Sequence, residues 1–124
     1  MTFTLPKEKS TLSKNLKIAC EALLDKKGED LKLLYFGEKS SLTDCFIIVT
    51  GNSNPHIKAL QNNVEKNLKE NQIEVFSKDR FQPSGWLVID AIDFVVHIFS
   101  SEQRDNYAIE QLWKDAEEIA LEDL

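Results

Sequence analysis

The 124-residue sequence has little cysteine and no long apolar run. Cys20 and Cys45 do not form a Cys-x-x-Cys pair, which excludes a disulfide framework and a zinc knuckle of the usual spacing. Both lie among apolar residues and are predicted to be inert core side chains. No window approaches the roughly 18 apolar residues of a membrane helix, and the N-terminus has no basic region followed by an apolar run. The expectation is a cytosolic protein without a membrane segment.

The sequence also lacks a basic stripe. Its net charge is −6, and residues 1–100 hold thirteen acidic and thirteen basic side chains, whereas residues 101–124 hold eight and two. Binding to a phosphate backbone depends on clustered cations, so direct nucleic-acid binding is not expected and a basic protein is the better partner. The alternative is that the acidic tail only keeps the protein soluble.

The remaining composition is that of an ordinary globular protein, with 42% hydrophobic and 29% charged residues. This length is enough to bury a core without disulfides or metal. We therefore expect one domain over residues 1–124, with its core at about 10–117.

Apolar residues at helical spacing predict three helices, over about 12–24, 57–71 and 107–119. The predicted caps are Ser10, Thr11 or Ser13 for the first helix and Asn54, followed by Pro55, for the second, with Gly28 ending the first.

Short apolar runs predict five strands. They cover residues 31–36, 44–50, 73–76 and two segments of 86–99 around a turn near Ala91–Asp93. The order of elements predicts an α/β fold with a mixed five-stranded sheet and helices packed mainly on one face. The other face would be more open and available for function.

The stretch "WLVIDAIDFVVHIFS" (86–100) is the most apolar in the chain, yet it contains Asp90, Asp93 and His97. With a two-residue turn at Ala91–Ile92, Asp90 would lie opposite Asp93, and Trp86 opposite His97. Alternation then separates a core face from a partner-facing one. The core face carries Leu87, Ile89, Phe94, Val96 and Ile98, and the other carries Trp86, Val88, Asp90, Asp93, Val95, His97 and Phe99. Positive φ is costly for isoleucine, so a longer turn that moves the two aspartates off opposition is the alternative.

A catalytic reading of these residues has weak support. Two aspartates near a histidine could hold a divalent metal, and "GNS" (51–53) could cradle a phosphate. However, aspartate is common beside turns, and "GNS" lacks the length and the lysine of a P-loop. We expect no metal, no cofactor and no enzyme activity, with Thr50, Gly51 and Ser53 shaping the strand-to-helix connection.

Two longer segments, 43–70 and 85–113, resemble the ribosomal silencing factor family, also called RsfS or Iojap. The matching residues are Asp44, Thr50, Gly51, Ser53, His56, Ala59, Trp86, Asp90, Asp93, Val95, Val96, His97, Arg104, Tyr107, Glu110, Leu112 and Trp113. The family commonly has Tyr-Gly in the turn where this chain has Ala91–Ile92.

The resemblance implies a fold similar to the nucleotidyltransferase superfamily without its catalytic acids. It also implies binding to large-subunit ribosomal protein fourteen, which blocks joining of the small subunit and lowers translation when nutrients are scarce. A metal-dependent nucleotidyltransferase-like enzyme is the alternative, and a structural subunit of another complex is a third reading.

The last predicted hairpin is our candidate contact surface. The candidate partner-binding residues are Trp86, Leu87, Asp90, Asp93, His97, Phe99, Arg104 and Tyr107. Trp86 and Phe99 would be apolar anchors, with Leu87 near the rim if the hairpin twists, and the aspartates would meet Lys or Arg. The opposing interpretation is that Trp86 caps the core and that Tyr107 and Trp113 pack the last helix. An exposed apolar face also allows a homodimer of the free protein.

Overall fold

The computed structural model of this protein describes residues 10–36, 45–78, 85–106 and 116–124. The strands are β1 (Glu29–Tyr35), β2 (Cys45–Gly51), β3 (Ser77–Lys78), β4 (Trp86–Asp90), β5 (Phe94–Ser100) and β6 (Glu117–Ile119). The helices are α1 (Ser10–Asp25), α2 (Asn54–Glu70), α3 (Ser101–Asn106) and the short 3-10 helix η4 (Leu121–Asp123). Within the described residues the strands form one six-stranded sheet, in the order β3-β4-β5-β2-β1-β6.

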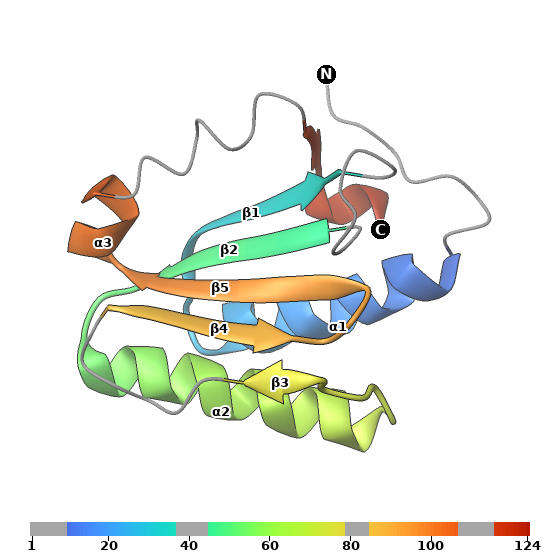
Figure 1. Ribbon diagram of the computed structural model, residues 1–124, viewed down its shortest axis with the longest axis horizontal. Coiled ribbons are helices and arrows are strands. Elements are labelled where there is room, and N and C mark those ends of the chain that lie inside the picture. Colours follow the sequence, from blue (N-terminus) through green and yellow to red (C-terminus); the bar gives the residue numbers. More distant parts are fainter. Residues whose placement is uncertain (1–9, 37–44, 79–84, 107–115) are drawn as a thin grey trace.

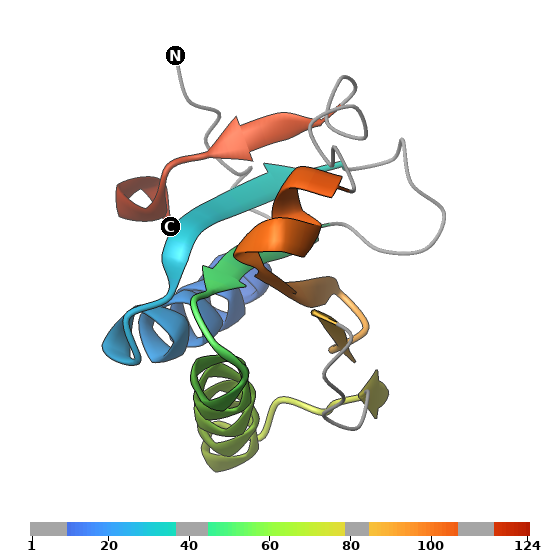
Figure 2. The same ribbon diagram turned by 90° about the vertical axis from the view of Figure 1, so that its left-hand side faces the viewer.

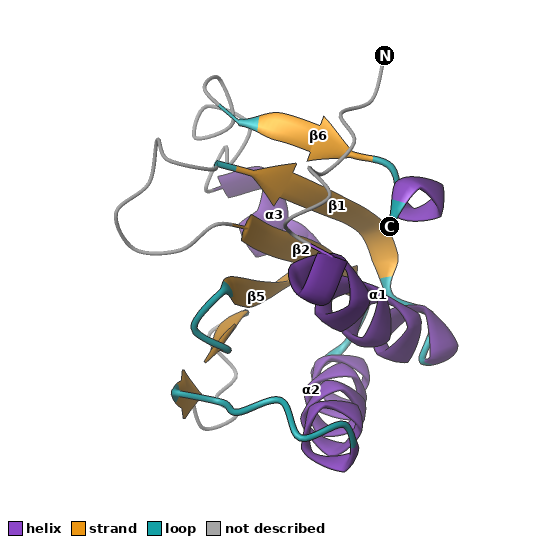
Figure 3. Cartoon of the chain, turned by 90° about the vertical axis from the view of Figure 1, so that its right-hand side faces the viewer, coloured by secondary structure: helices purple, strands orange, loops and turns teal. Residues whose placement is uncertain are grey.

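The sheet is mixed, as the sequence predicted. β2 and β5 are parallel, and the other neighbouring strands are antiparallel. Parallel neighbours need a long crossover, and the connection from β2 to β5 contains α2. Helices α1 and α2 lie side by side against one face of the sheet (Figure 1), and the same layering is visible from the end in Figure 3. The predicted α/β class is therefore confirmed.

The main core lies between this helix pair and the sheet. Side chains alternate across each strand, so every second residue of the central strands enters this core. The buried strand residues are Leu33, Cys45, Ile47, Val49, Leu87, Ile89, Phe94, Val96, Ile98 and Ile119. Burying each side chain of this size contributes about 1.5–3 kcal/mol, so this core dominates the stability of the fold.

The end of α1 shows a close approach of helix and sheet. The helix already includes Ser10, so all three predicted caps, Ser10, Thr11 and Ser13, lie inside its first turn. Gly28 follows the helix as predicted, and its N–H donates to the Leu23 carbonyl at 2.9 Å. A Cβ at Gly28 would lie 2.6 Å from Cγ2 of Val49, so this position needs glycine because of space and not because of its backbone angle.

The prediction of a strand at 73–76 was wrong. Gln72 has a φ of 57°, and Ile73 donates its N–H to the Leu68 carbonyl at 2.9 Å, so the chain is still closing the end of α2 there. Pairing with β4 begins at Ser77, the first residue of β3. Hydrogen bonding at the helix end therefore displaced the strand along the sequence.

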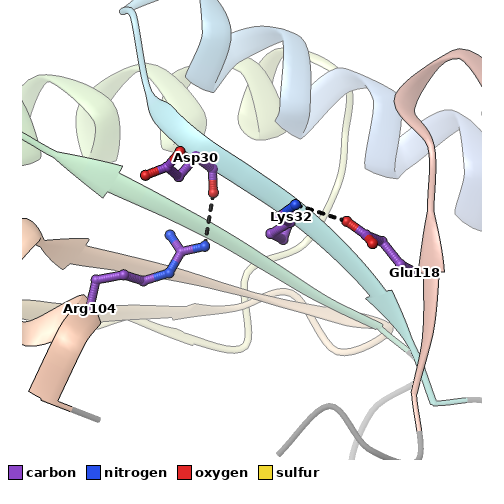
Figure 4. A network of polar contacts seen from close by, with 4 residues as sticks. All are labelled: Asp30, Lys32, Arg104 and Glu118. Carbon is purple, nitrogen blue, oxygen red and sulfur yellow. Dashed lines mark hydrogen bonds and ion pairs between the residues drawn. The ribbon is translucent and has the colours of Figure 1, made fainter. Parts of the chain in front are cut away.

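The end of the predicted third helix is also a strand. Residues 107–115 lie outside the described residues, but residues 117–119 form β6 and pair antiparallel with β1. Ile119 enters the main core opposite Leu33, while Glu118 pairs with Lys32 at 3.2 Å (Figure 4). Without β6, the edge of β1 would present unpaired backbone N–H and C=O groups. A helix at residues 117–119 would leave these groups without strand partners.

Candidate functional site

The sheet face opposite α1 and α2 carries the candidate residues Trp86, Asp90, His97 and Phe99. Figure 2 views the molecule from the end where α3 lies. Trp86 pairs with Phe99, and Asp90 with Val95. Asp90 therefore does not lie opposite Asp93, and of the two turns considered from the sequence the structure has the longer one. Because the true register differs by two residues, which is one full period of a strand, the two predicted faces are unchanged.

The longer turn holds the two aspartates apart. Ala91 donates its N–H to the Phe94 carbonyl at 2.9 Å, and Asp90 Oδ1 accepts the Ile92 N–H at 2.8 Å. Ile92 has a φ of 71°, the costly conformation anticipated for a β-branched residue. One carboxylate oxygen of Asp90 is therefore hydrogen-bonded within the turn, whereas the Asp93 side chain is exposed.

A row of aromatic rings crosses β4, β5 and β2 on this face and ends just after β1. We call it the aromatic row, and it consists of Trp86, Phe99, His97, Phe46 and Phe36. Centroid distances between successive rings are 5.1 Å for Trp86 and Phe99, 6.2 Å for Phe99 and His97, 4.6 Å for His97 and Phe46, and 4.8 Å for Phe46 and Phe36. Such pairs add about 0.5–1.5 kcal/mol each beyond burial, so the row stiffens the face.

Trp86 joins this row and still reaches solvent. Its indole N–H donates to Nδ1 of His97 at 3.1 Å, and its ring stacks on Phe99 at 23° between planes. The indole N–H can only donate, so Nδ1 of His97 accepts and a neutral ring carries its proton on Nε2. With 36% of its surface exposed, Trp86 both covers Phe99 and presents a fixed apolar surface, and its contact with a partner stays a prediction.

Phe99 and Leu87 have different surroundings from those expected of contact residues. Phe99 is fully buried beneath Trp86, and His97 is buried as well, so Trp86 is the exposed anchor of the pair. Leu87 was expected near the rim, but alternation turns it into the main core, where it is almost fully buried. Phe46 and Phe36 were not anticipated, because their place beside His97 depends on the pairing of β2 with β5 and β1.

Arg104 secures α3 to the strand ends. Its guanidinium donates to Oγ1 of Thr50 at 2.8 Å and to the backbone carbonyl of Asp30 at 2.9 Å, and Figure 4 shows the second contact. These two bonds direct the guanidinium back toward the sheet. Tyr107, the other residue expected in this region, lies outside the described residues.

The connection from β2 to α2 is held by its own side chains. Ser53 is the N-cap, in place of the predicted Asn54, and its hydroxyl accepts the His56 N–H at 3.2 Å. His56 Nδ1 accepts the Asn52 N–H, and Nε2 lies 2.7 Å from the Lys26 carbonyl. A Cβ at Gly51 would lie 2.6 Å from Ile57, so the glycine serves close packing. The prediction that Gly51 and Ser53 shape the connection is confirmed, whereas the Thr50 hydroxyl accepts a hydrogen bond from Arg104.

Two chemical features of the described residues bear on the catalytic alternative. No group of three or more His, Cys, Asp or Glu residues in the described ranges is arranged to hold a metal ion. Cys20 and Cys45 are buried free thiols, and burial, followed by the nearby Cys45, raises the pKa of the Cys20 thiol. A thiol held neutral is a poor nucleophile, which agrees with the predicted core role. In the same ranges, no helix is both long and apolar enough to cross a membrane.

Together, the fold and this surface define an α/β domain with one helix-covered sheet face and one aromatic face. Residues 9–124 match the family described as ribosomal silencing factor during starvation. A ribosomal silencing factor RsfS of Chromobacterium violaceum is 40% identical over 97 residues, which are 78% of this chain and 80% of that one. The Bacillus subtilis protein of the same name is 37% identical over 101 residues, 82% and 86% of the two chains.

A crystal structure of a Chromobacterium violaceum protein has the same fold. The TM-score is 0.75 at 40% identity, covering 81% of this chain and 83% of that chain. The chain therefore belongs to the ribosomal silencing factor family, and the resemblance noted from its motifs is confirmed.

Proposed function

We propose that this protein silences ribosomes by binding the large subunit at the face where the small subunit joins. Its contact there is large-subunit ribosomal protein fourteen, and the bound domain excludes the small subunit sterically in the cytoplasm when nutrients are scarce. The observation that carries the proposal is the sheet face opposite α1 and α2, on which Trp86 is stacked, hydrogen-bonded and still 36% exposed. Family membership supplies the ribosomal context.

This surface suits a protein partner for a physical reason. Interface hot spots are enriched in tryptophan because a rigid ring buries a large area at low entropic cost. Here the stacking on Phe99 and the bond to His97 fix Trp86 before any partner arrives. The ordering cost of binding is therefore reduced.

Electrostatics favours a basic protein over bare RNA. The chain carries a net charge of −6, with an exposed Asp93 beside the hairpin turn. Negative charge repels a phosphate backbone but steers a basic protein surface toward the complex. Asp93 is a better candidate for such a contact than Asp90, because one oxygen of Asp90 already accepts a turn hydrogen bond.

Steric exclusion requires no chemical step. If the domain and the small subunit need the same area of the large subunit, occupancy by one prevents binding of the other. The proposal therefore assigns no catalytic residue, metal or cofactor. The alternative of metal-dependent nucleotidyl transfer would rely on Asp90 and Asp93, which the turn separates into different roles.

The test is sucrose-gradient sedimentation of purified ribosomal subunits with the wild type, Trp86→Ala and Leu24→Ala. Leu24 is a matched control, since it is 42% exposed but lies on α1, in the helix layer. All three proteins must first show a folded circular dichroism spectrum. The wild type and Leu24→Ala should travel with the large subunit and reduce joined ribosomes, whereas Trp86→Ala should do neither.

The other outcomes are also informative. Absence of wild-type protein from the large-subunit fraction would refute the proposed function. Equal binding by Trp86→Ala would leave ribosome binding intact but remove Trp86 from the contact surface. Nucleotide turnover by the wild type with Mg²⁺ or Mn²⁺ would favour the enzymatic alternative.

A further inference from the structure

A second exposed apolar site lies at the far end of the β4–β5 hairpin. Phe76 is 74% exposed and Ile92 is 50% exposed, which makes them the two most exposed large hydrophobic side chains of the described residues. Phe76 donates its N–H to the Asp90 carbonyl at 2.7 Å, and Ile92 donates its N–H to Asp90 Oδ1 at 2.8 Å. Both backbones are thus held at Asp90, where β3 begins near the hairpin turn (Figure 1).

We call this site the Asp90 corner, defined as Phe76, Asp90, Ile92 and Asp93. Its position relative to Trp86 follows from strand geometry. Trp86 and Asp90 are the first and last residues of β4 and lie on the same sheet face, about 13 Å apart at the usual rise per residue. Asp90 of the corner and Trp86 therefore flank one continuous strand surface through Val88.

Ile92 is an unusual choice of residue for its position. Its φ of 71° lies in the left-handed region, where a β-branched side chain is disfavoured and glycine is not. Its half-exposed side chain is not among the residues of the core, so core packing does not account for the strain. Residues held in disfavoured conformations cluster at functional sites, and an isoleucine directed into solvent is suited to insertion into an apolar pocket.

Charge indicates the chemistry of the partner. The segments 72–78 and 85–97 contain three acidic residues, Glu74, Asp90 and Asp93, and one basic residue, Lys78. Glu74 and Asp93 are exposed and Asp90 is partly exposed, so acidic side chains predominate in the segments that carry the two apolar side chains. An apolar contact with an acidic rim complements an apolar pocket with a basic rim.

We infer that the Asp90 corner is a second docking point, which inserts Phe76 and Ile92 into an apolar pocket on a basic protein surface of the large ribosomal subunit. This inference rests on the proposed function. Two contacts about 13 Å apart along one strand resist pivoting of the bound domain. They would hold it in one orientation, which steric exclusion of the small subunit requires.

The experiment measures affinity for purified large subunits with Phe76→Ser, Ile92→Gly, the double variant and Leu24→Ser as the exposed apolar control. Glycine at 92 relieves the strained backbone, so a loss of binding by Ile92→Gly cannot be attributed to a weakened turn. Each single variant should bind about tenfold more weakly and the double variant about a hundredfold, as expected for removing one and two buried apolar side chains. Leu24→Ser should bind like the wild type.

Failure of this inference is distinguishable from failure of the proposed function. If the wild type and Leu24→Ser do not bind the large subunit, the proposed function fails and the inference fails with it. If the wild type binds, Trp86→Ala binds weakly and the double variant binds like the wild type, only the Asp90 corner is excluded. Unchanged ribosome binding together with loss of a wild-type dimer on size exclusion would assign the corner to a second copy of this chain and overturn the inference.

Discussion

The left-handed backbone at Ile92 allows a stability prediction worked from the structure. A φ of 71° costs a residue with a Cβ about 1–2 kcal/mol, and glycine avoids this cost. Glycine in turn gives the unfolded chain more freedom, which costs about 0.4–1 kcal/mol relative to alanine. Ile92→Gly and Ile92→Ala both remove the isoleucine packing, so that loss largely cancels between them. We expect Ile92→Gly to be the more stable variant by about 1 kcal/mol.

Urea unfolding followed by circular dichroism measures this difference. With equal slopes of about 2 kcal/mol per molar urea, the midpoint of Ile92→Gly should lie about 0.5 M above that of Ile92→Ala. The matched control is Lys17, an exposed residue in the middle of α1, where glycine should be less stable than alanine by about 1 kcal/mol. Equal or higher stability of Ile92→Ala would show that residue 92 is not left-handed in solution, and the turn capped by Asp90 would be refuted.

Three further predictions concern the core and the aromatic face. Gly28→Ala should destabilise the protein by about 1–3 kcal/mol in urea unfolding, because its Cβ would lie 2.6 Å from Val49; an unchanged midpoint would contradict that contact. Trp86→Phe keeps a ring on the face but loses the hydrogen bond to His97, so it should cost about 1 kcal/mol and less than Trp86→Ala; equal costs would argue against the stacking. Cys20 should react with a thiol reagent only after unfolding, and rapid labelling of the folded protein would refute its burial. Because burial raises the pKa of this thiol in the folded protein, the free energy of unfolding should fall as the pH rises above about 8.5, where the thiol of the unfolded chain ionises.

Much of the fold was predictable because its signals are local. The first two helices, the β1–β2 neighbours and the hairpin strands follow from the spacing of apolar residues within each segment. The two predicted faces of the hairpin are correct, although the register of a two-residue turn is not the one observed. Shifting a strand by two residues preserves the direction of every side chain, so the assignment of Trp86 to the open face did not depend on the turn.

The errors arose where distant segments compete for hydrogen bonds. The Ile73 N–H donates to a carbonyl at the end of α2, so β3 begins after the predicted 73–76 segment. Residues 117–119 pair with the edge of β1 and form β6, although the spacing of Ala116 and Ile119 also fits a helix. Such competition cannot be read from one segment, because the free energy of each choice depends on what the rest of the chain offers.

The candidate site shows the same division. The amino-acid sequence alone determined the family, the acidic balance and the residues that share the Trp86 face, because motifs, charge and strand alternation are properties of the chain itself. Only the tertiary structure decided that Trp86 covers Phe99, that Leu87 is buried, and that Phe76 meets the hairpin at Asp90. Exposure and contact are set by which strands pair, and that pairing minimises the free energy of the whole chain and not that of any one segment.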